Sequence, residues 1–211
     1  LWFEEGWVDY FSPQLYWPVN QIPQSYPVLL SWWHRQNRES RHLWPGLYTS
    51  RATGDRGLDE NVNQIMVTRG IVHDAPGNIH FSMRHLMANP DGLNDALRDG
   101  PYRRKALVPE TPWLDDEPPE PPVNLEWTPG RNLVGLKWDP GEGEDAFRWV
   151  VYWKRGDAWE YDIVPGGTRR CAILLEWIAR GEAQEPVTEV AVTAVDRMGN
   201  ESAPARLTLS R

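Results

Sequence analysis

The sequence predicts an α/β region followed by an all-β region. Strand-like and helix-like patterns alternate over the first half of the 211 residues, whereas short strands separated by turns recur over the second half. Proline and acidic residues crowd the segment 108–122 between the halves, which is typical of an extended, solvated connection. We therefore expect domains at 1–115 and 122–211, with residues 116–121 as the linker.

Three strand-then-helix units are predicted before the linker. The strand-like stretches are 7–17, 42–50 and 77–83, and the helix-like stretches are 25–40, 58–71 and 89–102. Ser25 is a candidate N-cap, and Pro27 falls in the first turn, where its missing N–H costs no hydrogen bond. The residues spaced for burial on the first two helices are Leu29, Leu30, Trp33, Val62, Ile65 and Met66.

Successive βα units imply parallel strands joined by helical crossovers. Either an open doubly wound sheet or part of a (β/α)8 barrel satisfies this pattern. No Gly-rich phosphate loop follows a predicted strand, which disfavours a nucleotide-binding sheet. Because a whole barrel needs about 250 residues, the first half would supply only about three of its eight units.

The second half reads as a β-sandwich. Alternation is clear in FRWVVYW, where Phe147, Trp149 and Val151 are expected to face the same way. Six or seven short strands in so few residues are typical of two packed antiparallel sheets. The predicted strands are VNLEWTP, LVGLKWDP, FRWVVYWKRG, AWEYDIVPGG, RRCAILLEW, TEVAVTAVD and ARLTLSR.

Composition excludes several classes of function. The formal net charge of −8 argues against nucleic acid as a partner, because phosphate neutralisation needs a basic patch. The single Cys171 allows no internal disulfide, and its strand-like surroundings predict a buried, inert thiol. The five histidines lack zinc-site spacing, so we expect no metal and no cofactor. No apolar run reaches transmembrane length, and no signal peptide is recognised.

The second half resembles a fibronectin type III domain. The resemblance is carried by PPVNLEW, by LVGLKWDP with Trp138 on the second strand, by VVYW and by VAVTAVDRMGNESAPA. One position departs from the family pattern, because Val190 stands where a corner tyrosine is usual. The corner hydrogen bond of the family is therefore not expected here.

The first half resembles the C-terminal part of the bacterial glycosyl-hydrolase-like 10 family. The matching motifs are GWVDYFSPQLYWP, YPVLLSWW, HLWPGLYTSR, QIMVTRG, GNIHFSMRHLMANPDGL and GPYRRKALVPETPWL, in the family's order. The resemblance implies a partial (β/α)8 barrel, its last three βα units, in a secreted or envelope protein. The family's earlier strands and acidic motifs are not in this chain, and LWFEEGWVDY reads as a helix end entering a strand. We therefore expect that an N-terminal part is missing, and that an envelope protein of this kind is either periplasmic or lipid-anchored through that part.

Candidate substrate-binding residues follow the first predicted strand. In a barrel, chemistry occurs at the carboxyl ends of the strands. Gln14 can hydrogen-bond sugar hydroxyls, and Tyr16 and Trp17 can stack on a pyranose ring. The alternative is that both aromatic rings only pack beneath the next loop.

The other two strand ends supply further candidates. Tyr48, Ser50 and Arg51 follow the second strand, and Arg51 can pair with a carboxylate or form a plain surface ion pair. Ser82 ends the third strand, whereas His80 is as readily a hydrogen-bonded core histidine. The predicted substrate-binding set is Gln14, Tyr16, Trp17, Tyr48, Arg51 and Ser82.

Acidic residues are missing where a glycosidase needs them. Glycoside hydrolysis generally uses two carboxylates across the scissile bond. The only acid near a predicted strand end is Asp55, several residues out in a loop, and Asp9 starts its strand on the opposite side of a barrel. The catalytic residues therefore stay unknown, and this chain alone is predicted to be inactive.

Three functions stay open. The first is a fragment of a glycoside hydrolase acting on an envelope glycan or another polysaccharide. The second is a non-catalytic carbohydrate-binding or surface-adhesion module, which would show an exposed aromatic row drawn from Trp149, Trp153, Trp159 and Tyr161. The third, favoured for residues 122–211, is a spacer. Exposed barrel edges also predict self-association of the first half.

Overall fold

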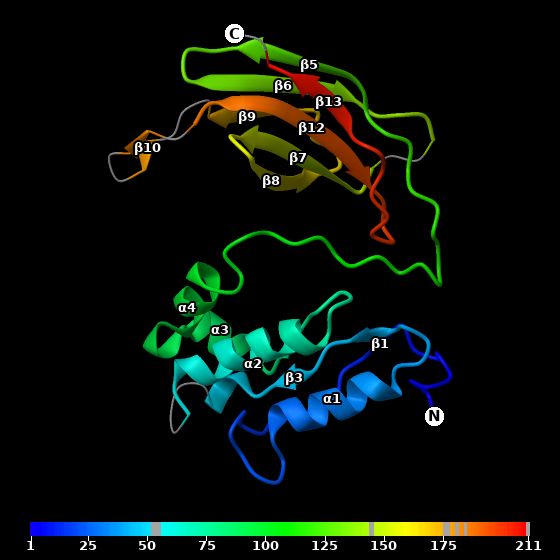
Figure 1. Cartoon of the computed structure of the whole chain (residues 1–211), viewed down its shortest axis with the longest axis vertical. Helices are drawn as coiled ribbons and strands as arrows, with labels where there is room; N and C mark the ends of the chain where they lie inside the picture. Colours follow the sequence, from blue (N-terminus) through cyan, green and yellow to red (C-terminus); the bar gives the residue numbers. More distant parts are fainter. Residues whose placement is uncertain (52–55, 144–145, 175–177, 180–181, 184, 210–211) are drawn as a thin grey trace. The chain divides into compact units, whose positions relative to one another are not determined.

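The chain forms two compact units in the computed structural model, residues 1–104 and 105–211 (Figure 1). The structure describes residues 1–51, 56–143, 146–174, 178–179, 182–183 and 185–209. The division falls before the predicted linker, because residues that follow Arg104 bond within the second unit. Thr111 N donates to Met198 O (2.9 Å), and the Tyr161 hydroxyl donates to Lys105 O (2.8 Å).

Parallel pairing joins three successive segments of the first unit. Strand β1 (Tyr10–Phe11) pairs with β2 (His42–Leu43), and β3 (Gly46–Leu47) pairs with β4 (Ile79–His80), in both cases in parallel. A parallel bridge between Gln14 and Gly46 extends the first pairing. The expected βαβ connections are therefore present, and their completion into a barrel stays a proposal.

The strands are shorter than predicted because prolines interrupt them. Pro13 and Pro45 have no N–H to donate to a ladder. Their carbonyl groups still accept, from Gly46 N at 2.9 Å and from Ile79 N at 3.1 Å. The three segments thus stay side by side although the regular strands are brief.

Two helices pack against these strands in a single shared core. Helix α1 (Tyr26–Gln36) begins after Ser25, which stands at the N-cap as predicted, although its hydroxyl donates to Val19 O (2.8 Å) instead of capping the helix. Helix α2 (Leu58–Ile71) matches its predicted span. The buried residues of both helices share one hydrophobic core with Leu15, Leu43 and Leu47 of the strand segments.

The predicted buried faces hold except at one position. Met66 is 52% exposed, so its predicted burial is wrong. The reason is that α2 turns a polar face inward, where Asn61, Gln64 and Thr68 are buried and hydrogen-bonded. The five other predicted residues, Leu29, Leu30, Trp33, Val62 and Ile65, are buried or packed on the core.

The third predicted helix, at residues 89–102, is shorter than expected, and a helix that was not predicted precedes it. Helix α3 (Met83–Ala88) ends at Asn89, whose left-handed backbone (φ 46°) turns the chain into a short 3-10 turn, Pro90–Gly92, before α4 (Leu93–Asp99). A second 3-10 turn, Thr49–Arg51, follows β3. Leu93 and Leu97 of α4 are buried in the core of this unit.

The face of the strands opposite the helices is rich in exposed aromatic residues. Successive strand residues point to opposite faces, and Phe11 and Leu47 pack on the helix side. Tyr10, Ile79 and Phe81 therefore lie on the other face, where they are 51%, 38% and 57% exposed. Parallel sheets are normally covered on both faces, so this one-sided packing is unusual.

The second unit is the predicted two-sheet β-sandwich (Figure 1). One sheet has the order β5-β6-β9 and the other β13-β12-β7-β8, all antiparallel. Their bounds are β5 Val123–Pro129, β6 Leu133–Asp139, β7 Arg148–Arg155, β8 Ala158–Pro165, β9 Arg170–Leu174, β12 Val187–Val195 and β13 Ala205–Thr208. Strands β10 (Ile178–Ala179) and β11 (Glu182–Ala183) form a separate small pair.

The core of the sandwich contains two fully buried tryptophans. Trp138 and Trp149 meet edge to face, with ring centroids 5.9 Å apart. Trp149 and Val151 share this core, as the alternation of FRWVVYW predicts. Val190 is also fully buried in this core.

Candidate functional site

A hollow of about 340 Å³ lies on the uncovered face of the parallel strands in the first unit. Gly46 lines the hollow without a side chain, and a Cβ added there would lie 3.5 Å from the Tyr16 ring. The size falls within the range of small-ligand sites. The lining residues are Ser12, Gln14, Tyr16, Gly46, Ile79 and Phe81.

Three aromatic rings converge at this hollow from three separate strand ends. Tyr16 stacks on Tyr48 with ring centroids 4.8 Å apart, and Phe81 lies 6.1 Å from Tyr16 and 6.3 Å from Tyr48. The guanidinium of Arg51 lies 5.3 Å from the centre of the Tyr48 ring. We call Tyr16, Tyr48 and Phe81 the aromatic platform. Partial burial, with Tyr48 nearby, raises the pKa of the Tyr16 hydroxyl, so it is a neutral donor and acceptor near neutral pH.

The structure brings four of the six predicted residues together. Gln14 and Tyr16 line the hollow, while Tyr48 and Arg51 stack beside them. Trp17 and Ser82 do not line it. The Trp17 carbonyl instead accepts a hydrogen bond from Gln64, and Ser82 stands before the first turn of α3.

Sequence reasoning missed Ser12 and Phe81. The available signal for Phe81 was its position directly after β4, which ends at His80 rather than at Ser82. Residue alternation then places Phe81 and Ile79 on the hollow's side of the strand. Ser12 lies two residues before the predicted Gln14, so the same alternation could have placed it on the hollow's side.

His80 is a hydrogen-bonded histidine, as one of the two interpretations expected. Its Nδ1 lies 2.9 Å from Thr49 Oγ1, and its Nε2 lies 2.8 Å from the Tyr102 hydroxyl. Burial lowers the pKa of His80, and burial raises the pKa of Tyr102 to about 12. The neutral imidazole therefore serves as a structural link between the 3-10 turn Thr49–Arg51 and Tyr102 near the end of the unit.

Carboxylates are missing from the described lining of this hollow. Asp9 lies before β1, where its carbonyl accepts from His42 N (3.2 Å), and Asp55 lies outside the described residues. Across the described ranges, no group of three or more His, Cys, Asp or Glu residues could hold a metal ion. The visible chemistry of the site is thus ring stacking and neutral hydrogen bonding.

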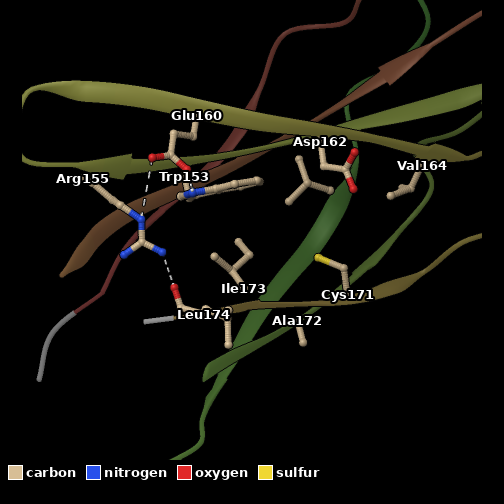
Figure 2. A pocket seen from close by; sticks show the side chains of 10 residues that line it. Trp153, Arg155, Glu160, Asp162, Val164, Cys171, Ala172, Ile173 and Leu174 are labelled. Carbon is tan, nitrogen blue, oxygen red and sulfur yellow. Dashed lines mark hydrogen bonds and ion pairs between the residues drawn. The ribbon is translucent and has the colours of Figure 1, made fainter. Parts of the chain in front are cut away.

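A second cavity, of about 360 Å³, lies between the two sheets of the sandwich (Figure 2). Its acids are already engaged. Glu160 accepts from Trp153 Nε1 (2.8 Å) and faces Arg155 (3.9 Å), and Asp162 lies 2.7 Å from Lys105 Nζ. The guanidinium of Arg155 also donates to the Leu174 carbonyl.

Cys171 lines this second cavity as a poor nucleophile. Burial, with Asp162 nearby, raises its pKa to about 11, so the thiol stays protonated near neutral pH. This agrees with the inert thiol that the sequence predicts. Because the polar groups of this cavity bind one another, the strand-end hollow of the first unit is the better candidate site.

The sandwich lacks an exposed row of the four aromatic candidates. Trp149 is fully buried, and Trp153 lines the inner cavity. Trp159 is 37% exposed but has the guanidinium of Arg206 at 5.7 Å from its ring centre, and the Tyr161 hydroxyl bonds to Lys105 O.

Of the described helices, none is both long and apolar enough to span a membrane.

Comparison with solved structures finds small β domains that cover less than half of this chain. A myokine structure is 23% identical, covers 44% of this chain and 99% of its own, and has a TM-score of 0.33. The fibronectin type III domain of the human collagen α1(XX) chain is 17% identical, covers 44% of this chain and 86% of its own, and has a TM-score of 0.35.

Comparison with curated proteins finds relatives named as glycosyl hydrolases. No protein-family model matches the chain. Glycosyl hydrolase YngK of Bacillus subtilis is 33% identical over 137 residues, which are 62% of this chain and 27% of the relative. Glycosyl hydrolase DigH of Escherichia coli is 47% identical over 32 residues, 15% of this chain and 7% of the relative. The chain therefore spans about a quarter or less of these relatives and is related in sequence to proteins named glycosyl hydrolases.

Proposed function

We propose that the first unit forms the sugar-binding part of a glycoside hydrolase site. The observation that carries this proposal is the aromatic platform beside Gln14 at the ends of three parallel strands. Aromatic faces stack on the apolar face of a pyranose ring, while the Gln14 amide and the Tyr16 hydroxyl can exchange hydrogen bonds with its hydroxyls. The relation to proteins named glycosyl hydrolases supports the same substrate class.

The proposed enzyme needs residues that this chain does not provide at the hollow. Hydrolysis of a glycosidic bond requires an acid and a second carboxylate on opposite sides of the bond. The described lining offers only neutral groups. We therefore propose that a preceding part of the barrel supplies both carboxylates, and that this chain alone binds glycan without cleaving it.

We propose an envelope or secreted setting for the whole protein, because its proposed substrate is a glycan. A polysaccharide is the proposed partner, and the sandwich is proposed to act as a spacer, since the four aromatic candidates named above are buried or contact other groups of the sandwich. The exposed edges of the parallel strands are also proposed to mediate self-association unless further barrel strands pair with them. A monodisperse monomer in size-exclusion chromatography would contradict that last proposal.

Binding is tested with chitotetraose, an oligosaccharide with the N-acetylglucosamine units found in envelope glycans. Titration calorimetry should detect binding to the chain, and Tyr16→Ala should weaken it about tenfold, because one stacking ring contributes about 1.4 kcal/mol. Tyr10→Ala is the matched control, since Tyr10 is exposed on the same face but does not line the hollow. Equal losses in both variants would contradict the assignment of the site.

Activity is tested by comparing this chain with a version extended N-terminally through a whole barrel. Cleavage of glycan by the extended form alone would support a hydrolase with upstream carboxylates. Binding without cleavage by either form would favour the non-catalytic module. Cleavage by this chain alone would contradict the proposed division of the site.

A further inference from the structure

We infer that the N-terminal end of α2 positions the loop bearing Tyr16, and that Gln64 is a positioning residue for glycan binding. This inference rests on the function proposed above. The loop comprises residues 16–19, which we call the platform loop. It leaves the first strand segment at the point where Tyr16 enters the aromatic platform.

Three side chains, from Arg56 just before α2 and from Glu60 and Gln64 in its first half, hold three backbone groups of the platform loop. They come from residues spaced four apart, and Glu60 and Gln64 therefore lie on one face of the helix. Each bond has ordinary hydrogen-bond length. The bonds run from Arg56 Nη1 to Tyr16 O (2.8 Å), from Gln64 Nε2 to Trp17 O (3.0 Å) and from Val19 N to Glu60 Oε1 (2.8 Å).

Gln64 is the buried member of this set. Its side chain is 1% exposed, and Asn61 Nδ2 donates to its Oε1 at 3.2 Å. That contact orients the Gln64 amide so that its nitrogen faces the Trp17 carbonyl. Loss of the Gln64 amide would leave the Asn61 amide and the Trp17 carbonyl each without its hydrogen bond to Gln64. Polar groups left without a partner inside a protein are costly.

The rest of the platform loop is fixed as well. Ser25 Oγ donates to Val19 O (2.8 Å), and Tyr26 N donates to Pro18 O (3.2 Å). The backbone is thus held on the helix side, and the Tyr16 ring is left to stack on Tyr48 at the hollow. None of the three α2-end side chains lines the hollow, so they act on a ligand only through Tyr16. A pre-organised ring lowers the entropy cost of binding.

The test uses the full chain, with Gln64→Met against Tyr26→Phe. Gln64→Met keeps side-chain length and removes both amide contacts. Tyr26→Phe removes the buried hydroxyl bonds to Thr68 and Asn78 in the same network but keeps the backbone N–H that Tyr26 donates to Pro18 O. Both variants should lower the melting temperature. Only Gln64→Met should raise the Kd for chitotetraose, by about tenfold.

A ligand-free measurement separates this inference from the proposed function. Amide hydrogen exchange of residues 15–20 should accelerate in Gln64→Met and stay unchanged in Tyr26→Phe. Arg56→Lys, which keeps a donor for Tyr16 O, should accelerate exchange less than Arg56→Ala. Equal exchange of the loop in Gln64→Met and native protein would overturn the positioning role. Failure of the native chain to bind chitotetraose would instead overturn the proposed ligand, while the exchange data still decide whether Gln64 holds the loop.

Discussion

The two units of this chain differ in how they bury their apolar side chains. The sandwich encloses its core between two sheets whose principal strands are four to nine residues long. The first unit has strands of two residues, a polar inner helix face and aromatic side chains on an uncovered sheet face. The sandwich therefore relies on apolar packing, whereas the α/β unit relies more on specific hydrogen bonds and leaves aromatic side chains exposed on one sheet face.

The largest loss of stability is expected when a buried aromatic ring is removed from the apolar core of the sandwich. Trp149→Ala should lower the free energy of unfolding of the sandwich by about 3–5 kcal/mol, because it removes a fully buried ring that contacts Trp138. Trp159→Ala, in the neighbouring strand, should cost less than about 1 kcal/mol, since its ring is on the outer face. Urea unfolding of both variants measures the difference, and similar losses would contradict the packing described.

The next effect probes the polar core of the first unit. Thr68→Val should destabilise it by about 1–3 kcal/mol, because the Thr68 hydroxyl lies 2.8 Å from Tyr26 Oη and accepts from Asn78 Nδ2 at 3.1 Å. Thr188→Val, at an exposed position of β12, is the matched control and should change stability little. Thermal unfolding followed by circular dichroism checks both, and a stabilised Thr68→Val variant would show that the polar face is dispensable.

The same contrast explains which features the sequence could predict. The seven main sandwich strands were recognisable because period-2 alternation reports apolar burial directly. The polar face of α2 was not, because Asn61, Gln64 and Thr68 find partners from distant segments that no local pattern identifies. The predicted burial of Met66 failed for that reason.

At the candidate site, the expectation that binding residues follow the carboxyl ends of the strands identified some of the residues at the hollow. It selected Gln14, Tyr16 and Tyr48, which lie at or beside the hollow. It missed Phe81 because strand ends are uncertain by a residue or two, and one residue reverses the face of a strand. The prediction for Trp17 also differs from the structure by one residue. Its neighbour Tyr16 belongs to the aromatic platform, whereas the Trp17 carbonyl accepts a hydrogen bond from Gln64 of α2.

A pH-dependent effect should distinguish the first unit from the sandwich. Burial lowers the pKa of His80 below its ordinary value of 6.5, so the unfolded chain binds this proton more readily. Its stabilising contribution is complete above pH 6.5 and is lost as pH falls through the lower folded-state pKa. The free energy of unfolding should therefore fall less steeply between pH 6.5 and 5 in His80→Gln than in the native chain. Parallel curves would contradict this linkage.

The smallest effect tests where the sandwich begins. Lys105 Nζ lies 2.7 Å from Asp162 and donates to Ile163 O at 3.1 Å, but both charged side chains are largely exposed. Lys105→Met should therefore destabilise the sandwich by less than about 1 kcal/mol, with the loss shrinking at high salt. Arg103→Met is the control, because Arg103 precedes the division between the units. A salt-dependent loss confined to Lys105→Met would place residue 105 in the sandwich's folding unit, whereas identical unfolding of the two variants would return the boundary to the predicted linker at 116–121.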